Sequence, residues 1–266
     1  MEPTVQPPNR CIFCDSSGPF NSVEHIVPES LGNDILVLAP GWVCDSCNNT
    51  HSAFESRVLG HTIIGTERCV LGVVTKKGKP SRSKVHGITW FAEPGTNEGV
   101  VSAEADWRKV PILLNADENS GVMVFPLHDG FCADIAKLLL KMGIEFLAVL
   151  IRAGRALYEC KEAREYVLGR DDVAWPYFIL RSRSVLGHLT SVVAAFPEVH
   201  DYIRSCGFDV FLHSVDEEPV FVFTYGHFLA AIGLNSREAG WTSALKEWDC
   251  PFVGCPAEYQ GLSWPR

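Results

Sequence analysis

The spacing of apolar and polar residues divides the chain into segments that favour different secondary structures. Between residues 131 and 168, apolar residues recur at steps of three and four with Lys and Glu between them, which predicts one long helix or two helices. Residues 62–128 contain short β-branched and aromatic runs separated by Gly, Pro and Asn, a pattern typical of strands. Further strand-like runs lie near 173–181, 207–213 and 219–225, and residues 197–207 favour a helix.

Four cysteines form two closely spaced pairs near the start of the chain, Cys11-x-x-Cys14 and Cys44-x-x-Cys47, with 29 residues between the pairs. Two such pairs can place four thiolates tetrahedrally around one Zn²⁺. A segment with so few large apolar side chains would depend on the metal for much of its stability. The pattern therefore predicts a closed structural zinc site, and the alternative is a group of buried or redox-active thiols. The other six cysteines show no second site of this kind.

Two polar motifs accompany the cysteines. Glu24 and His25 lie in a short strand-like run that ends at Pro28, and a strand would direct their side chains to opposite sides. Asn48 follows Cys47 directly, at or near the start of a predicted helix. Hydrolysis of a phosphodiester needs an activated water and a Lewis acid. A histidine suits the role of general base, and the side-chain oxygens of Glu24 and Asn48 suit a hard divalent cation.

The motifs C-x-x-C, E-H-I-V-P-E-S-L-G and C-x-x-C-N-N, in this order, resemble the HNH endonucleases, in the branch whose ββα-metal fold is held by a four-cysteine zinc. The resemblance is specific over residues 11–60, looser to about residue 84, and weak or absent beyond. It implies a metal-dependent endonuclease that hydrolyses phosphodiester bonds in DNA, with a structural Zn²⁺ and a catalytic Mg²⁺ or Mn²⁺. It further implies His25 as the general base and Glu24 and Asn48 as ligands of the catalytic cation.

The chain departs from the HNH pattern in two places. The middle Asn of the family, which orients the base histidine, has no clear counterpart, and Asn33 is the best candidate for it. Many relatives offer a second metal-binding His one turn after the position of Asn48. Here Ser52 stands at that position and His51 precedes it by one residue, so His51 is a further candidate ligand of the catalytic cation.

The chain carries a formal net charge of −9, which by itself argues against a nucleic-acid binder because phosphates attract Lys and Arg. The charge is unevenly spread, however. Residues 1–90 are neutral overall, and the whole excess of negative charge falls in residues 91–266, which could face a protein partner or a regulatory ligand. Between Arg57 and Lys84, seven basic residues stand against one acidic residue. We expect a nucleic-acid backbone to contact this stretch, the alternative being a solvated loop; the candidate residues are Arg57, Lys76, Lys77, Lys79, Arg82 and Lys84.

The apolar segments predict neither secretion nor a membrane span. The first ten residues contain no apolar run, which excludes a secretory signal there. The longest apolar-rich stretch, from Phe131 to Ile151, is interrupted by four charged residues, too many for a membrane span. We therefore expect a reduced cytoplasmic environment, in which closely spaced cysteines indicate a metal rather than disulfides.

These patterns predict an α+β fold in four parts. We expect residues 1–10 to form a flexible leader and residues 61–128 a β-rich connection with the basic stretch. For residues 11–60 the resemblance implies a small zinc-stabilised HNH domain with a treble-clef-like ββα-metal core. Residues 129–266 form a larger α+β domain with a long central helix and an unassigned role. Removal of zinc should then unfold the HNH domain and leave the helix over 131–168 intact.

Two other functions fit the same motifs. One is a zinc-stapled module that binds nucleic acid or protein without catalysis, although such a module has no use for Glu24, His25 and Asn48 together. The other is a toxin or defence nuclease that is regulated through its C-terminal region.

Overall fold

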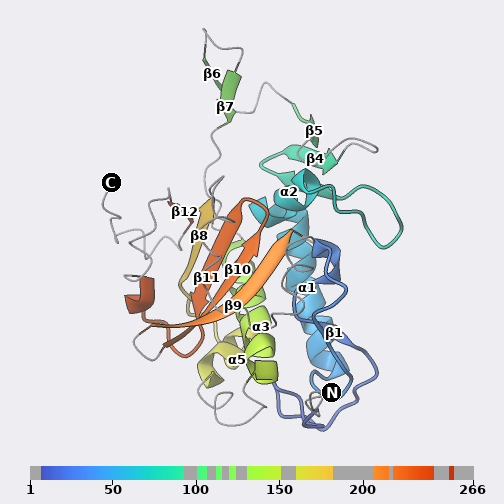
Figure 1. Cartoon of the computed structure of the whole chain (residues 1–266), viewed down its shortest axis with the longest axis vertical. Helices are drawn as coiled ribbons and strands as arrows, with labels where there is room; N and C mark the ends of the chain where they lie inside the picture. The colour runs from blue at the N-terminus through green and yellow to red at the C-terminus, as the bar shows by residue number, and fades with distance from the viewer. Residues whose placement is uncertain are drawn as a thin grey trace.

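The chain folds into helices and several separate antiparallel sheets, as the computed structural model shows (Figure 1). The structure describes residues 7–92, 101–106, 112–115, 120–123, 131–150, 160–181, 207–215, 218–242 and 252–254. Within these stretches the fold is mixed α+β, which confirms the predicted class. None of the helices in this part of the chain is long and apolar enough to cross a membrane.

A short hairpin and a helix form the N-terminal part. Strand β1 (Glu24–His25) pairs antiparallel with β2 (Val37–Leu38), and His25 lies opposite Val37. A 3-10 turn, η1 (Glu29–Leu31), lies in the connection between these strands. Helix α1 (Asp45–His61) begins after Cys44, so the second cysteine pair spans the start of the helix. The described part of residues 11–60 thus contains two short paired strands followed by one helix.

Helix α2 (Ile63–Val70) replaces a predicted strand. The β-branched run at 62–75 was expected to be extended, and this expectation is wrong for its first half. Thr62 ends α1 with an extended backbone, and its hydroxyl oxygen accepts a hydrogen bond from the amide of Ile64, which starts the second helix. The new helix buries Ile64 and Cys69, and this packing overrides the local strand preference.

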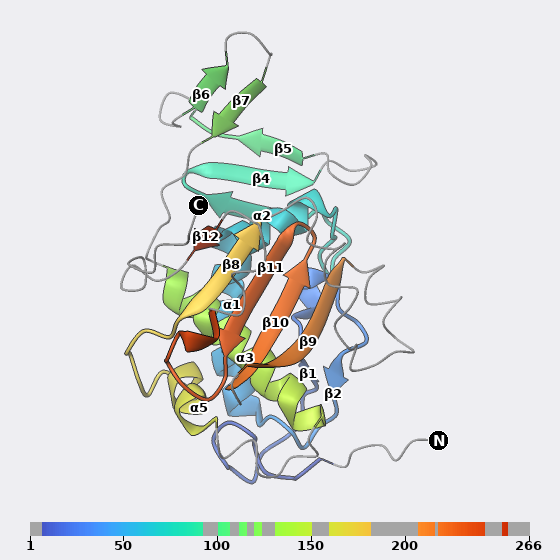
Figure 2. The same ribbon diagram turned by 60° about the vertical axis from the view of Figure 1, so that its left-hand side comes forward.

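The β-rich connection is confirmed after residue 82. Strands β3 (Arg82–Val85), β4 (Ile88–Ala92) and β5 (Val101–Glu104) form an antiparallel sheet in sequence order. Strands β6 (Ile112–Asn115) and β7 (Ser120–Met123) form a separate hairpin. Figure 2 shows both units stacked beyond α2, at one end of the molecule.

The C-terminal part combines two helices with a larger sheet. Helices α3 (Cys132–Leu150) and α5 (Lys161–Val167) confirm the helical prediction for their residues. The sheet is antiparallel with strand order β12-β8-β11-β10-β9; the strands are β8 (Tyr177–Arg181), β9 (Phe208–Val215), β10 (Glu218–Tyr225), β11 (Phe228–Gly233) and β12 (Phe252–Gly254). The predicted helix at 197–207 lies outside the described residues, apart from its last residue.

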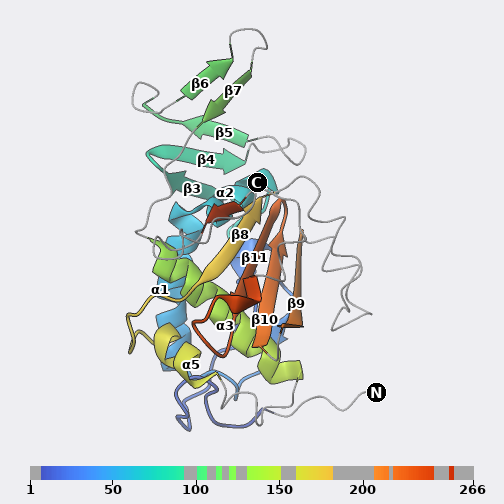
Figure 3. The ribbon, with the colours of Figure 1, turned by 90° about the vertical axis from the view of Figure 1, so that its left-hand side faces the viewer.

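Helix α3 is the central element of the core. It lies between α1 and the sheet (Figure 3), and most of its residues are buried. Gly143 allows its close approach to the sheet, because a Cβ atom there would lie 2.7 Å from Leu234 and 2.9 Å from Phe221. One continuous hydrophobic cluster joins the N-terminal cysteines to α3, α5 and the sheet. The N-terminal part is thus packed into the larger core.

Candidate functional site

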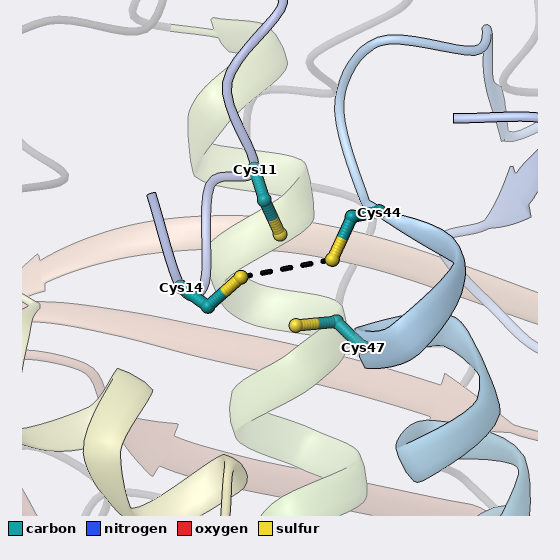
Figure 4. A group of neighbouring side chains, drawn as sticks. All are labelled: Cys11, Cys14, Cys44 and Cys47. Carbon is teal, nitrogen blue, oxygen red and sulfur yellow. Dashed lines mark hydrogen bonds between the residues drawn. The ribbon is translucent and has the colours of Figure 1, made fainter. Parts of the chain in front are cut away.

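The four paired cysteines converge at one point. Their sulfur atoms all lie within 4.8 Å of one another and point toward a common centre (Figure 4). The Sγ atoms of Cys14 and Cys44 are 3.6 Å apart, far beyond the ~2.05 Å of a disulfide. Tetrahedral zinc with Zn–S bonds of about 2.3 Å separates its sulfurs by about 3.8 Å. The cluster can therefore hold a metal ion such as zinc.

Backbone hydrogen bonds shape the two turns that carry the cysteine pairs. The amide of Asp15 donates to the carbonyl of Cys11 and closes the first turn, and the amide of Asn48 donates to the carbonyl of Cys44 in the second. The amide of Ile12 donates to the carbonyl of Trp42, which holds the two turns together. These backbone hydrogen bonds thus position the four cysteines around one centre.

The thiols are electrostatically linked. A hydrogen bond from Cys47 lowers the pKa of Cys11 to about 4, against the opposing effect of burial. The same contact, together with burial, raises the pKa of Cys47. Burial also raises the pKa of Cys14. The opposite shifts of Cys11 and Cys47 thus reflect the close contact of their two sulfur atoms.

Strand β1 directs Glu24 and His25 to different environments, as alternation along a strand predicts. The His25 side chain is 23% exposed, and its Nε2 lies 3.6 Å from Oε2 of Glu29. The same Glu29 oxygen lies 2.5 Å from Nζ of Lys76. A residue of the basic stretch is therefore linked through Glu29 to the candidate base.

Glu24 instead faces the interior and binds Lys141 of α3. Its Oε1 lies 2.6 Å from Nζ of Lys141. The same ammonium group lies 3.1 Å from Glu55 of α1 and 3.2 Å from Glu145, one turn further along α3. It also donates to the carbonyl oxygen of His25 at 2.5 Å. Three elements that are distant in the sequence thus meet at one fully buried lysine.

Burial and mutual contact shift the pKa values within the buried group that Lys141 forms with its three carboxylate partners, Glu24, Glu55 and Glu145. Burial acts to lower the pKa of Lys141, but the charges of Glu145, Glu24 and Glu55 together outweigh it, so the pKa is raised and the ammonium stays charged. Burial raises the pKa of Glu145 and of Glu24, against the attraction of Lys141. The carboxylates are thus more costly to ionise here than in water.

His51 completes the buried group from α1. It is fully buried, and its Nδ1 lies 4.0 Å from Oε1 of Glu145. Burial, and after it the charge of Lys141, lowers its pKa well below the usual value, so the imidazole is neutral. The structure therefore brings His51 and Glu24 together; one ligand atom of each, with one from Glu145, lies within 4.8 Å of the others.

Asn48 lies in the first turn of α1 and contacts the chain next to β1. Its side-chain amide donates to the hydroxyl of Ser22 and to the carbonyl of Val23, each at 3.2 Å. Asp45 strengthens the same connection by accepting hydrogen bonds from the backbone and side chains of Asn21 and Ser22. Asn48 thus ties α1 to the strand, whereas the carboxylate of Glu24 faces α3.

Asn33 is a buried support of the hairpin. Its side-chain nitrogen donates to the carbonyls of Val27 and Leu36 at 2.6 and 3.1 Å. Its side-chain oxygen accepts from the amides of Ile35 and Leu36 at 3.1 and 2.9 Å. One side chain therefore fixes the connection between β1 and β2.

The expected phosphate-binding residues divide into two groups. Arg57 binds Asp134 of α3 through two hydrogen bonds of 2.6 and 2.7 Å. All six are exposed, and the five besides Arg57 are Lys76, Lys77, Lys79, Arg82 and Lys84. Lys76 contacts Glu29, and Arg82 stacks over the ring of Phe91 at 5.4 Å. Arg57 therefore binds a partner within the fold although its side chain is 49% exposed. The other five can meet an external ligand at the surface.

Sequence reasoning missed Glu55, Lys141 and Glu145 as members of the site. Lys141 and Glu145 served only to exclude a membrane span, although they stand one turn apart in a helix that is otherwise almost wholly apolar. In a helix that is buried on all sides, such charges must find partners inside the protein. The pair of charges in this apolar helix could therefore have predicted buried ion pairs, but it does not show which residues would be the partners.

No family model matches the chain, and neither a curated protein nor a solved structure matches it. The functional interpretation therefore rests on the residues and their geometry.

Proposed function

We propose that the chain is a metal-dependent endonuclease of the HNH type that hydrolyses phosphodiester bonds in DNA. The observation that carries the proposal is the partly exposed His25 on a hairpin that Asn48 ties to the first turn of α1, directly after the cysteine cluster. We assign a structural zinc to that cluster. The four converging sulfurs support this assignment, because soft thiolate ligands select such metals.

The proposed reaction uses His25 as the base. A water molecule gives its proton to the imidazole while its oxygen attacks phosphorus, and the bond from phosphorus to the leaving oxygen breaks. Glu29 lies within reach of the resulting imidazolium and would stabilise it. The exposed lysines of the basic stretch would bind the flanking phosphates.

A divalent cation, Mg²⁺ or Mn²⁺, would supply Lewis-acid stabilisation of the phosphate when it is bound. Glu24 is a candidate ligand, because its Oε2 has no hydrogen-bond partner among the described residues. Asn48 would offer its side-chain oxygen, since its nitrogen already donates to Ser22 and Val23. The burial of Glu24 restricts where such an ion can sit, and His25 remains the residue whose removal tests the proposal most directly.

The proposal is tested by incubating supercoiled plasmid with the purified chain over a series of Mg²⁺ and Mn²⁺ concentrations. We expect nicking by the wild-type chain and its loss in His25→Ala. His61→Ala is the matched control, because His61 is a solvent-accessible histidine at the far end of α1. Equal nicking by the wild-type chain and His25→Ala would overturn the proposal, as would no nicking by either.

A second function is favoured by one specific contact. The ammonium of Lys141 lies on the carboxylate of Glu24, so a cation built into the protein already binds the acidic residue next to the base. A zinc-stapled module that binds nucleic acid or protein without cleaving it would have this arrangement. DNA binding that is unchanged in His25→Ala, without divalent-dependent cleavage by the wild-type chain, would favour the module over the enzyme.

A further inference from the structure

The buried group around Lys141 contains an imidazole without a hydrogen bond. His51 is fully buried between Phe13 and Phe54, whose ring centroids lie 4.5 and 5.6 Å from its own. Neither ring nitrogen has a hydrogen-bond partner in the described part of the chain. A neutral imidazole has one donor and one acceptor nitrogen, and leaving both unpaired inside a protein is costly. The lone pair of His51 is thus available to a ligand that the side chains of the described residues do not supply.

The same group contains more negative than positive charge. The carboxylates of Glu24, Glu55 and Glu145 face the single ammonium of Lys141, and none of these four side chains is more than 18% exposed. Ionisation of all three carboxylates would leave two negative charges that the single ammonium does not compensate. Oε2 of Glu24 and both carboxylate oxygens of Glu145 also lack hydrogen bonds within the described stretches. Buried charges in proteins are paired or bind metals, so this surplus calls for a cation.

The unpaired atoms are close enough to share one ion. Glu24, His51 and Glu145 each offer an atom within 4.8 Å of the other two, and Nδ1 of His51 lies 4.0 Å from Oε1 of Glu145. A cation bound at about 2.0–2.2 Å by nitrogen and oxygen separates its ligands by about 3–4 Å. The ammonium of Lys141 contacts Oε1 of Glu24 and Oε2 of Glu145, which leaves the other oxygen of each for the ion.

We propose that Glu24, His51 and Glu145 bind one divalent transition-metal ion. An imidazole with two carboxylates suits Zn²⁺, Mn²⁺, Fe²⁺ or Co²⁺, whereas Ca²⁺ and Mg²⁺ prefer oxygen ligands alone. A charge of +2 would balance the surplus, and the ion would satisfy the imidazole at the same time. Because the ligands come from β1, α1 and α3, the ion would join the hairpin that carries His25 to the C-terminal helix.

This site differs in chemistry from the four-cysteine cluster, which offers only sulfur. The site does not depend on hydrolysis by the chain, although Glu24 is shared with the proposed catalytic cation. Its test therefore measures metal binding and not cleavage, so that either proposal can fail alone.

The test titrates the purified, metal-free full-length chain with Co²⁺ under reducing conditions. Thiolate-bound Co²⁺ gives an intense charge-transfer band in the near ultraviolet, and Co²⁺ bound by nitrogen and oxygen gives only weak visible bands. Equilibrium dialysis at each point counts the total bound metal. We expect the wild-type chain to bind a second Co²⁺ after the thiolate band is complete.

Glu145→Gln keeps the shape of the side chain and removes its charge. We expect it to lower the affinity for the second Co²⁺ ion by about 10-fold or more and to leave the thiolate band unchanged. Glu55→Gln is the matched control from the same buried group, because Glu55 contacts Lys141 but is not a proposed ligand. We expect it to keep the second ion. His51→Gln should lose that ion, and an intact thiolate band would show that the N-terminal part is still folded.

Two results would overturn the proposed metal site. One is a wild-type chain that binds only the thiolate-bound ion. The other is a second ion whose affinity is the same in Glu145→Gln as in the wild-type chain, since that ion would lie elsewhere. His25→Ala should bind both ions normally, whether or not it has lost cleavage.

Discussion

The ammonium nitrogen of Lys141 lies 2.6 Å from Oε1 of Glu24, which joins the middle of α3 to β1. The lysine is fully buried, and it also binds the carbonyl oxygen of His25. The candidate base is therefore held in place by a helix from the C-terminal part of the chain. Residues 11–60 and α3 form one structural unit around this contact.

Lys141→Met should destabilise the fold strongly. The substitution keeps an apolar chain of similar length but leaves three carboxylates around a site without its cation. Breaking a buried ion pair by removing one partner costs about 3–5 kcal/mol. Urea unfolding measures this difference, and Lys161→Met, at an exposed position in α5, should change stability little. A similar small change in both variants would show that Lys141 does not hold the buried group together.

Asn33→Ala should loosen the hairpin that positions His25. The substitution leaves two carbonyls and two amides of the β1–β2 connection without their buried partner. An unsatisfied buried polar group costs about 1–3 kcal/mol, so we expect a loss of about 2 kcal/mol or more in thermal or urea unfolding. Asn49→Ala changes an exposed residue of α1 and serves as the control. If the two variants are equally stable, the assigned role of Asn33 fails.

Removal of zinc should affect more than the N-terminal part. The sequence alone predicted that the helix over 131–168 would survive, but Arg164 of α5 donates to the carbonyl of Phe13 at 3.1 Å and binds Asp15 at 2.8 Å. The cysteine turns also share a hydrophobic cluster with α3. We now expect Cys44→Ser to speed hydrogen exchange in α1 and in α3. Cys132→Ser, which lies outside the four-cysteine group, should not. Protection of α3 that is unchanged in Cys44→Ser would restore the earlier expectation.

The exposed lysines and Arg57 should respond differently in DNA binding. Each lost phosphate contact lowers the slope of log affinity against log salt by about 1. We expect this effect for Lys77→Gln and Lys79→Gln. Arg57→Gln should leave the slope unchanged and lower stability by up to about 1 kcal/mol, because the guanidinium is engaged by Asp134. Fluorescence anisotropy over a salt series gives the slopes, and a reduced slope in Arg57→Gln would place that residue on the DNA.

Several secondary-structure elements could be predicted because the spacing of residues within each segment determines them. The three- and four-residue apolar spacing indicated α3, and the β-branched and aromatic runs indicated β4 and β10. The two cysteine pairs indicated their own convergence, since a two-residue gap favours a tight turn. By contrast, the β-branched run after Thr62 favoured a strand and became α2, because its partner surface lies on β3 and β4 and is set by tertiary packing.

The candidate site was only partly predictable for the same reason. The orientation of Glu24 away from His25 follows from strand geometry. The identity of its partner does not, because Lys141 and Glu145 reach it only through the packing of α3 against α1. Arg57 illustrates the reverse case: its charge indicated a phosphate ligand, and the fold gives it Asp134 instead.

The most direct test of the account measures chemical rescue at His25. The rate of cleavage of a labelled duplex under single turnover is compared for the wild-type chain and His25→Gly, each with Mn²⁺ and with or without added imidazole. Loss of a general base lowers such rates by about 10²–10⁴-fold. We predict a loss in this range for His25→Gly, with partial recovery in imidazole, while bound zinc and thermal stability stay unchanged. Cleavage by His25→Gly at the wild-type rate, or no cleavage by the wild-type chain, would contradict the account.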